Sequence, residues 1–497
     1  MKLSNSTWPS NERTWERRRL AGRWFGFRRC KQPAGLSSVV PQNGTEGERR
    51  RSQDASVLIL VLWISIGLVA IALYFANSMT FELRASDNRA TGIAAEQAIE
   101  GAARYVGWAL SNFATNGAVP NNTQFSCKAV PVGDAHFWLI GRDPSGTLAT
   151  EPYFGLVDEA SKLNLNRAGT NALSYLPNMT LDFADAIVDW RSTNGIGDYA
   201  LDYASLGYTD KNSPFETVDE LRLVYGATID LLVGEDVNRN GVLDANETDV
   251  NGNGTLDPGL FECVTVYSRQ PNFHSDGSSL TNVNLAIEAR LQTLFQSAGV
   301  GNASGLATSI YNHVHPRNGP ANPFPGILNF CLFCQNQGMS SADFAKIYYN
   351  ITTSTNLYTT GLLNINTASA TVMTALFMGL GVDQSTAQGA AQTLVTYRQQ
   401  NPNNLNAIAW IVDALGNTSP VVQTLANANR DYITTESFQF TADIAAVGPF
   451  GRGYRRVKFI FDISEGMPKI IYRQDLSRLG WALGEKARTI WVAKKTQ

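Results

Sequence analysis

The sharpest chemical pattern in the sequence is a twelve-residue run rich in oxygen-bearing side chains, DVNRNGVLDANE, at residues 236–247. Calcium takes roughly six to eight hard oxygen ligands, and an EF-hand loop supplies them from positions 1, 3, 5, 7, 9 and 12, with glycine at position 6 for the sharp turn. Here Gly241 is that glycine, and the ligand positions are Asp236, Asn238, Asn240, the Val242 carbonyl, Asp244 and Glu247. The run therefore predicts a calcium site rather than a plain polar turn.

A second, incomplete loop starts immediately after the first. Its donors in the same register are Asp249, Asn251, Asn253, the Thr255 carbonyl and Asp257. Its twelfth position is Leu260, so the usual bidentate carboxylate is missing unless Glu262 or a residue of the first loop substitutes. Only Thr248 separates the two loops, which leaves no room for an EF-hand helix. We expect two adjacent loops at 236–260 that hold calcium as a structural ion, with the affinity of about 10⁻⁴ to 10⁻³ M typical of extracellular modules.

Histidine usage gives no indication of catalysis. The four histidines are His136, His274, His313 and His315. None belongs to a GxSxG or HExxH pattern, so no nucleophile and base can be assigned. His313 and His315 offer two ring nitrogens, which by themselves are more often surface or packing groups than metal ligands. We predict that the protein is not an enzyme; an exported hydrolase is the alternative.

Cysteines allow two interpretations. Four of the five cysteines, Cys127, Cys263, Cys331 and Cys334, follow the apolar segment described below. In an oxidising compartment they permit two disulfides in three possible pairings, and the spacing Cys331-Leu-Phe-Cys334 would allow that pair to close its own short loop. A zinc site is the competing interpretation of this pair, but no second CxxC accompanies it. We expect disulfides, with the pairing undetermined.

An uncharged apolar segment separates a basic leader from the rest of the chain. Residues 55–76, ASVLILVLWISIGLVAIALYFA, would span about 30 Å as a helix, the thickness of the hydrocarbon core of a bilayer. Residues 1–54 hold twelve Lys/Arg against five Asp/Glu, a net charge of +7; since the whole chain has −3, the remainder has −10. By the positive-inside rule, we predict a single-pass protein with a cytoplasmic N-terminus and an exported C-terminal part.

A helical pattern continues beyond the apolar segment. Small and apolar residues recur every three or four positions, at Gly92, Ala95, Ile99, Ala102, Val106 and Leu110. The spacing predicts one helix of roughly 55 residues, far longer than an ordinary globular helix. Its first half would face lipid, and its second half would pack on a soluble domain.

Two distant regions show the alternation typical of β-strands. The first is 124–142; the second comprises 437–441, 455–463 and 468–474, where VKFIFDI and KIIYR suit antiparallel strands with one buried face. Between them, residues 158–430 have mostly helix and loop patterns. The predicted fold is α+β: a long N-terminal helix packed on a small antiparallel sheet, which a large, mainly helical domain interrupts.

A short asparagine motif recurs three times within the insertion. It is KLNLN at 162–166, NVNL at 282–285 and LNINTA at 363–368, and each copy precedes a helix-loop-helix pattern. The copies are too irregularly spaced for a solenoid. Asparagine can accept hydrogen bonds from the first free N–H groups of a helix, so we predict helix caps rather than catalytic groups.

Several of these segments, in this order, resemble the K-type minor pseudopilins of type II secretion systems, the general secretion pathway protein K family. The matching segments are 58–63 (LILVLW), 155–166 (GLVDEASKLNLN), 186–191 (AIVDWR), 215–224 (FETVDELRLV), 363–368 (LNINTA) and 472–481. The resemblance extends from residue 55 to residue 481, and it depends on the shared order, because no single segment is decisive.

The resemblance implies a pilin-like domain interrupted by a helical domain with two sterile-alpha-motif-like, or helix-hairpin-helix-like, units. It implies a role in capping the periplasmic pseudopilus tip with the minor pseudopilins I and J, which helps start fibre assembly for protein export across the outer membrane. The anchor would then lie in the cell inner membrane, with the C-terminal domain in the periplasm. Calcium in the helical domain also fits the family.

The expected organisation has six parts. They are a basic cytoplasmic leader (1–54), a transmembrane helix (55–76), the first part of the pilin-like domain (77–157), the inserted helical domain (158–430), the second part of the pilin-like domain (431–481) and a tail (482–497).

The resemblance also places a processing site. Prepilin peptidase cuts family members after a glycine that follows basic residues; the matching positions here are Asp54 and Ala55, so cleavage would fall between Ala55 and Ser56. Counting from Ser56, the fifth residue is Leu60, where most pseudopilins carry a glutamate that pairs with a neighbour's N-terminal amine. An unpaired charge inside a bilayer is expensive, so an apolar residue suits a tip subunit without a distal neighbour. The residues do not decide whether the leader is removed. They also do not decide whether the fibre serves secretion or is a related type IV pilus.

A DNA-binding or DNA-uptake protein anchored in the inner membrane is the alternative from another class. The motif at 363–368, followed by Gly379 and Gly381, resembles helix-hairpin-helix units of competence-type DNA receptors, whose turn amides hold a phosphate. Between residues 361 and 400, however, Arg398 is the only basic side chain. Because phosphate neutralisation supplies most of the affinity for DNA, we expect no nucleic-acid partner.

Overall fold

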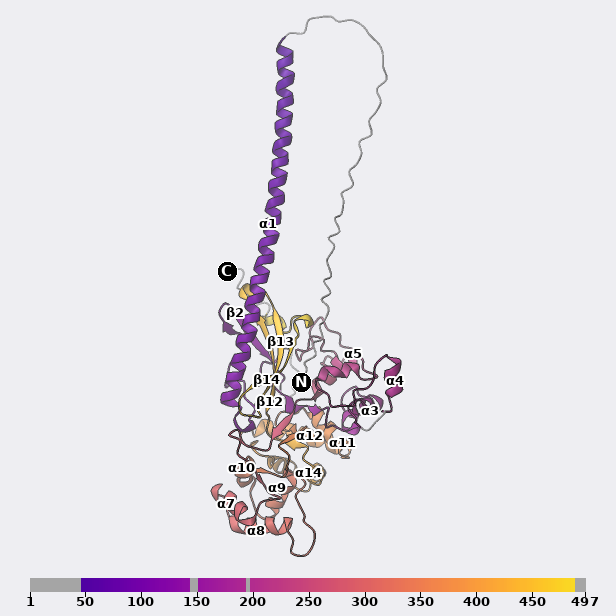
Figure 1. Cartoon of the computed structure of the whole chain (residues 1–497), viewed down its shortest axis with the longest axis vertical. Helices are drawn as coiled ribbons and strands as arrows, with labels where there is room; N and C mark the ends of the chain where they lie inside the picture. The colour runs from indigo at the N-terminus through magenta and orange to yellow at the C-terminus, as the bar shows by residue number, and fades with distance from the viewer. Residues whose placement is uncertain (1–45, 144–150, 194–196, 488–497) are drawn as a thin grey trace, which may run out of the picture. The chain divides into compact units, whose positions relative to one another are not determined.

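The computed structural model describes residues 46–143, 151–193 and 197–487 (Figure 1). The chain divides into two compact units, Met1–Met79 and Thr80–Gln497, and helix α1 (Glu46–Phe113) contains the division between them. The sheet and the sites described below belong to the second unit.

Helix α1 includes the predicted apolar segment. From Val57 onward it is long and apolar enough to cross a membrane: its most apolar window of 18 residues has a mean hydropathy of 2.8, and none of that window is buried. Leu60, Trp63 and Ile66 are among the exposed side chains. Because leaving aliphatic side chains in water costs free energy, lipid is the environment that this part of α1 favours. The finding is consistent with a single-pass anchor.

The second half of α1 is amphipathic, as predicted. All six predicted contact positions are buried: Gly92, Ala95, Ile99, Ala102, Val106 and Leu110. The apolar ones share a hydrophobic core with large side chains of the sheet, including Phe137 and Phe459. Small residues on the helix therefore meet aromatic residues on the sheet, which lets the two layers pack closely.

The sheet is antiparallel throughout and combines strands from both sides of the insertion. Its order is β1 (Val130–Val132), β2 (Ala135–Ile140), β12 (Gln439–Val447), β13 (Arg455–Asp462) and β14 (Lys469–Asp475), and β3 (Val157–Asp158) also pairs with β12. In the register of β2 and β12, Leu139 is opposite Ile444 and Phe137 is opposite Ala446. Figure 1 shows β2 and β13 beside the C-terminal part of α1. The predicted α+β fold is confirmed.

Strand β12 is buried along its whole length because both faces of the sheet are covered. Side chains at alternate positions, such as Ala442 and Ile444, enter the core against α1. Those between them, such as Ala445 and Val447, pack with Trp138 and Leu483 on the opposite face.

Between β3 and β12 the chain forms three repeats of one unit, each opened and closed by a pair of short parallel strands. The opening strands are β4 (Leu163–Asn164), β7 (Thr281–Asn282) and β10 (Leu363–Asn364), and their closing partners are β5 (Val264–Thr265), β8 (Ile351–Thr352) and β11 (Ile433–Thr434). In every unit the residue after the opening strand donates its N–H to the closing threonine carbonyl, at 2.8 to 3.0 Å. We call these units one, two and three.

Helices fill the space between the opening and closing strands. Unit one contains α2 (Thr170–Ser174), α3 (Leu181–Trp190), α4 (Ala200–Ser205), a 3-10 turn at Val218–Leu223, α5 (Ile229–Val233) and α6 (Leu260–Cys263). Unit two contains α7 (Glu288–Ser297), α8 (Ala303–Val314), α9 (Ile327–Asn336) and α10 (Ser341–Tyr348). Unit three contains α11 (Ala370–Gly379), α12 (Gln384–Gln400), α13 (Trp410–Leu415) and α14 (Pro420–Ala426). Their buried apolar side chains form one continuous core.

Linkers and short turns complete the second unit of the chain. Strands β6 (Arg269–Pro271) and β9 (Tyr358–Thr360), which lie in the links between successive repeats, pair with each other in antiparallel fashion. Further 3-10 turns are Thr115–Gly117, Glu159–Ser161, Pro449–Gly451 and Ser477–Leu479.

The recurring asparagines are not helix caps, so that prediction was wrong. The Oδ1 atoms of Asn164, Asn282 and Asn364 accept the N–H of the asparagine two residues later, at 2.9 to 3.0 Å. The N-caps of the helices that follow are Gly169, Ile287 and Ser369, each five residues after the first asparagine. A turn thus separates each motif from its helix, and the asparagine cannot reach the free N–H groups.

The second asparagine of each motif fixes a distant segment of its own unit. The amide of Asn166 both donates to and accepts from the main chain of Phe215, at 2.9 and 2.7 Å. Asn284 does the same with Phe324, at 3.0 and 2.8 Å. Asn366 donates to the Leu405 carbonyl at 3.0 Å and accepts from Trp410 Nε1 at 3.0 Å. We call these side chains the amide clamps; their role is structural.

Candidate calcium loops and their contacts with the sheet

The first predicted loop lies between α5 and α6 and folds around Asp236. The buried Asp236 carboxylate accepts the backbone N–H groups of Asn240 at 2.9 Å and Gly241 at 2.7 Å. Gly241 has φ of +84°, a left-handed conformation that favours glycine. Val242, the predicted carbonyl donor, gives its N–H to Asn240 Oδ1 at 2.9 Å. The loop therefore has the tight turn at position 6 that the sequence predicts.

Glu247 closes this loop from its other end. Its Oε1 accepts the N–H of Asn238 at 3.1 Å, and its Oε2 accepts the N–H of Asp244 at 3.0 Å. Position 12 thus reaches back over positions 3 and 9, and both of its carboxylate oxygens lie at the loop.

The side chains of positions 3, 5 and 9 converge. The Nδ2 atoms of Asn238 and Asn240 both donate to Asp244 Oδ2, at 2.6 and 2.9 Å. Asn238 Oδ1 is buried and has no hydrogen-bond partner. Turning an amide about its last side-chain bond exchanges oxygen and nitrogen, which would aim Oδ1 toward the Asp244 carboxylate. The predicted donors are hard oxygens, and one of them, Asn238 Oδ1, has no hydrogen-bond partner. Such a set of oxygens fits calcium.

Among the described residues, no group of three or more His, Cys, Asp or Glu side chains is arranged to hold a metal. The three carboxylates among the predicted donors of the first loop, Asp236, Asp244 and Glu247, are therefore not gathered into such a group in this structure; the other predicted donors are two amides and a main-chain carbonyl. Such mixed oxygen sets are typical of calcium and differ from the nitrogen and sulfur sets of zinc.

The second loop repeats the hydrogen-bond pattern of the first at the surface. Asp249 accepts N–H groups from Gly252, Asn253 and Gly254, at 2.6 to 3.2 Å. Asn251 donates to Asp257. Thr255 donates its N–H to Asn253 Oδ1 at 2.7 Å. All five predicted positions therefore belong to one turn.

The carboxylate that serves the second loop is one that the sequence did not indicate. Glu235, the residue before the first loop, accepts the N–H of Val250 at 2.7 Å and of Asp257 at 3.0 Å. Glu262, the residue considered from the sequence, instead pairs with Arg142 at 2.7 Å through both of its oxygens. This ion pair engages the carboxylate of Glu262.

Two arginines attach the first loop to the sheet. Arg456 of β13 is fully buried and holds Asp443 of β12 through two hydrogen bonds, at 2.8 and 2.6 Å. The same guanidinium donates to the loop carbonyls of Asn238 and, at 2.7 Å, Arg239. Arg142 also donates to the Arg239 carbonyl, at 3.1 Å. The loop carbonyls at positions 3 and 4 are therefore used for contact with the sheet.

Burial governs the electrostatics of the loop. It raises the pKa of Asp236 to about 6, against the opposing effect of the Arg142 guanidinium. Burial would also raise the pKa of Glu262, but its ion pair with Arg142 lowers that pKa to about 2. A cation bound beside Asp236 would offset the cost of burying its negative charge.

The acidic pair of the 155–166 segment fastens the insertion to the sheet. Asp158 accepts hydrogen bonds from Asn364 at 2.8 Å and Thr367 at 2.6 Å in unit three, and also from Ser437. Glu159 accepts from Thr265, which closes unit one, and from Thr441 of β12. In this contact, two carboxylates accept hydrogen bonds from hydroxyl and amide groups.

The cysteines and histidines form no site in the described residues. Cys127, Cys263, Cys331 and Cys334 are free and buried, so the expected disulfides were wrong. Cys331 and Cys334 both belong to α9 and enter the apolar core, where burial raises their thiol pKa values. His313 stacks on Phe324 with ring centroids 4.7 Å apart.

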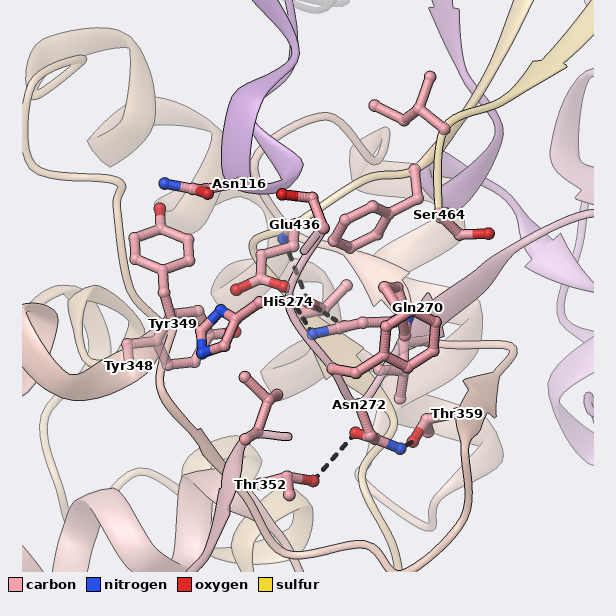
Figure 2. A pocket seen from close by; sticks show the side chains of 18 of the residues that line it. Asn116, Gln270, Asn272, His274, Tyr348, Tyr349, Thr352, Thr359, Glu436 and Ser464 are labelled. Atoms are coloured by element: carbon pink, nitrogen blue, oxygen red, sulfur yellow. Dashed lines mark hydrogen bonds between the residues drawn. The ribbon is translucent and has the colours of Figure 1, made fainter. Parts of the chain in front are cut away.

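A polar cavity of about 280 Å³ lies in the second unit where α1 ends (Figure 2). Figure 2 shows Glu436, His274 and Tyr349 around it. Glu436 accepts from Gln270 Nε2 at 2.7 Å, and burial raises its pKa to about 8. On the other side Asn272 accepts from Thr352 Oγ1 at 2.9 Å. The cavity lies between the links of the repeats and the end of the long helix.

No family model and no curated protein matches this chain. Among solved structures, it is similar to a chain of the crystal structure of the GspK-GspI-GspJ complex from the enterotoxigenic Escherichia coli type 2 secretion system. The identity is 10%, the match covers 76% of this chain and 96% of that chain, and the TM-score is 0.37. A TM-score below 0.5 does not establish a shared fold, so the assignment below depends on the sequence and architecture of this chain.

Proposed function

We propose that this protein is a membrane-anchored minor pseudopilin of the type II secretion system, of the K type. One observation carries the proposal: the amphipathic second half of a helix with an unburied apolar first half packs on an antiparallel sheet, and that sheet is assembled from both sides of a three-unit insertion. A fibre subunit of this kind needs a helix that lipid can hold and a domain that stays folded outside the membrane. The ordered sequence resemblance points to the same family.

The position that suits this subunit is the tip of the pseudopilus. The fifth residue after Ala55 is the apolar Leu60, which needs no partner amine inside the bilayer. A tip subunit has no distal neighbour to supply one. In this proposal the N-terminus is cytoplasmic, the sheet and insertion are periplasmic, and pseudopilins I and J are the partners, as in the GspK-GspI-GspJ complex.

Calcium has a structural part in this proposal. Asp236, Asn238, Asn240, Val242, Asp244 and Glu247 would hold the ion. When bound, calcium supplies a charge that ties these donors together without any redox or acid-base step. Arg456 and Arg142 then hold the loop carbonyls against the sheet. The ion would stiffen the contact between the insertion and β13.

The proposal is tested by deleting the gene and measuring the export of type II substrates. We expect secretion to stop in the deletion strain and to return with the full-length protein, and purified full-length protein to bind pseudopilins I and J together. Normal secretion in the deletion strain would contradict the function. N-terminal sequencing of the membrane-extracted protein then tests processing: a start at Ser56 supports a cleaved fibre subunit, whereas an intact leader contradicts cleavage.

A further inference from the structure

Two arginines of unit one lie beside a third that comes more than 200 residues later in the sequence. Arg167 follows strand β4, Arg191 ends helix α3, and Arg430 follows helix α14. Arg191 donates through Nη2 to the carbonyl of Ala168. Arg430 donates through Nη2 to the carbonyl of Arg167 at 3.2 Å. The guanidinium groups of Arg191 and Arg430 thus bind neighbouring main-chain carbonyls, those of Ala168 and Arg167.

These three positive charges have no carboxylate partner. No ion pair found in the described residues includes any of them. Burial and then the charges of Arg167 and Arg430 lower the pKa of Arg191 to about 10. Burial and Arg430 also lower the pKa of Arg167. Because arginine stays charged at neutral pH, the cluster carries an uncompensated repulsion that an anion would relieve.

Arg191 also has an unsatisfied donor. Its Nη1 is buried and has no hydrogen-bond partner. Unit three provides a direct comparison, since Arg398 occupies the same structural role and donates through Nη1 to the carbonyls of Ile365 at 3.0 Å and Ala368 at 2.7 Å. In unit three these carbonyls satisfy Nη1, whereas in unit one it lacks an acceptor. A buried guanidinium N–H without an acceptor is costly.

A cavity lies beside Arg191, and Arg167 and Arg430 do not line it. Arg191 lines a cavity of about 280 Å³ together with Asn166, Ser192 and Thr193. Asn166 is an amide clamp and is fixed by Phe215, so one wall of the cavity is rigid. The neighbouring hydroxyl groups can donate hydrogen bonds to an oxygen ligand.

We propose that Arg167, Arg191 and Arg430 form a binding site for an oxyanion, supplied by an acidic side chain of a partner protein. Arginine forks bind carboxylate and phosphate oxygens in the same bidentate way, so a small free oxyanion is the second possible source. Nucleic acid is disfavoured, because the chain beyond its basic leader has a net charge of −10 and would repel a polyanion. The site lies outside the calcium loops and does not depend on the secretion role.

The test uses detergent-solubilised full-length protein and isothermal titration at low salt. The probes are sulfate, which leaves calcium in solution, a hexaglutamate peptide and a duplex DNA. We expect sulfate and hexaglutamate to bind, the peptide more tightly, and the double variant Arg191→Gln/Arg430→Gln to lose about tenfold or more in affinity for both. Arg317→Gln removes one charge from an exposed loop of unit two and should leave both affinities unchanged.

Folding is separated from binding by a second measurement. Sulfate should raise the melting temperature of the wild type and of Arg317→Gln, but not of the double variant. If the double variant does not fold, Arg430→Gln alone replaces it, because this side chain is only half-buried on the ring of Tyr432, 4.6 Å from its centroid. Absence of sulfate and peptide binding, or equal binding by the variants, would overturn the site. Tighter binding of the duplex DNA than of the hexaglutamate peptide would contradict the proposal that the ligand is an acidic side chain of a partner protein.

Discussion

Asn238 joins the two functions of the first loop, because its side chain points to the predicted ligands while its carbonyl is bound by Arg456. An ion held by the side chains would therefore also order the main chain that contacts the sheet. This coupling is a property of single residues, and two substitutions examine it.

Glu247→Gln should remove most of the stabilisation by calcium. The change keeps the shape of the side chain but removes the negative charge at position 12, the usual bidentate ligand. Wild-type protein should gain about 2.7 kcal/mol at a free calcium concentration about 100 times Kd, seen as a higher melting temperature than in EGTA, and the variant should gain much less. Asp134→Asn, in the exposed turn between β1 and β2, should respond to calcium as the wild type does. An equal calcium response in Glu247→Gln would contradict the site.

Arg456→Met should destabilise the protein by about 3 to 5 kcal/mol, because it leaves the Asp443 carboxylate buried without its partner. The double variant Arg456→Met/Asp443→Leu should be less destabilised than the single one, since it removes the stranded charge. Urea unfolding of all the variants measures both effects. If Asp443→Leu lowered the unfolding free energy of Arg456→Met further, the unpaired Asp443 carboxylate would not be the cause of the destabilisation.

At the scale of elements, the insertion depends on the three amide clamps more than on its helices, several of which have only five or six residues. Helices this short are not stable by themselves. The clamps and the closing strands give each unit its shape by joining segments about 40 to 100 residues apart, which is also why the asparagines recur.

Asn366→Ala should therefore cost about 1 to 3 kcal/mol, because it leaves the Trp410 indole N–H and the Leu405 carbonyl without their partner. Asn366→Asp keeps an acceptor for Trp410 and should recover part of the loss. Asn171→Ala, at an exposed position in α2, is the matched control. Hydrogen exchange should show faster opening of α13 in Asn366→Ala; unchanged exchange there would contradict the clamp.

At the scale of the whole molecule, a buried carboxyl group couples stability to pH. Glu436 lies beside the cavity where the end of α1 meets the links of the insertion, and burial raises its pKa from 4.5 to about 8. The folded protein thus binds a proton that the unfolded chain releases between these values. Its contribution to stability is fully present below about pH 4.5 and is lost as the pH rises through about 8.

Glu436→Gln should flatten this dependence. We expect the melting temperature of the wild type to fall between about pH 5 and pH 8 by more than that of the variant, a difference on the order of a few kcal/mol in unfolding free energy. Other buried carboxyls, Asp158 and Asp431, each with a pKa raised by burial to about 6, contribute to the fall at lower pH in both proteins. If the melting temperatures of the wild type and of Glu436→Gln changed in parallel with pH, Glu436 would not be a source of the pH dependence.

Features that depend on local spacing could be predicted from the amino-acid sequence alone. The apolar run and the three- to four-residue recurrence gave the two halves of α1, and alternation identified the strands that pair across the insertion. The turn at residues 236–247 could be predicted from the sequence, because all of its proposed calcium donors lie within twelve consecutive positions. The packing of Phe137 and Phe459 in one core follows from the same alternation.

Features that depend on residues brought together from distant positions became visible only in the folded chain. Arg456 and Lys458 alternate with Val457 and Phe459 in β13, so the sequence assigns their face to solvent; the insertion covers it and buries Arg456 against the calcium loop. Likewise, the segment at 361–400 holds one arginine, whereas folding brings Arg430 beside Arg167 and Arg191, which lie more than 200 residues earlier in the sequence. Periodicity reports which face of an element is apolar, but charge complementarity across the chain exists only once the chain has folded.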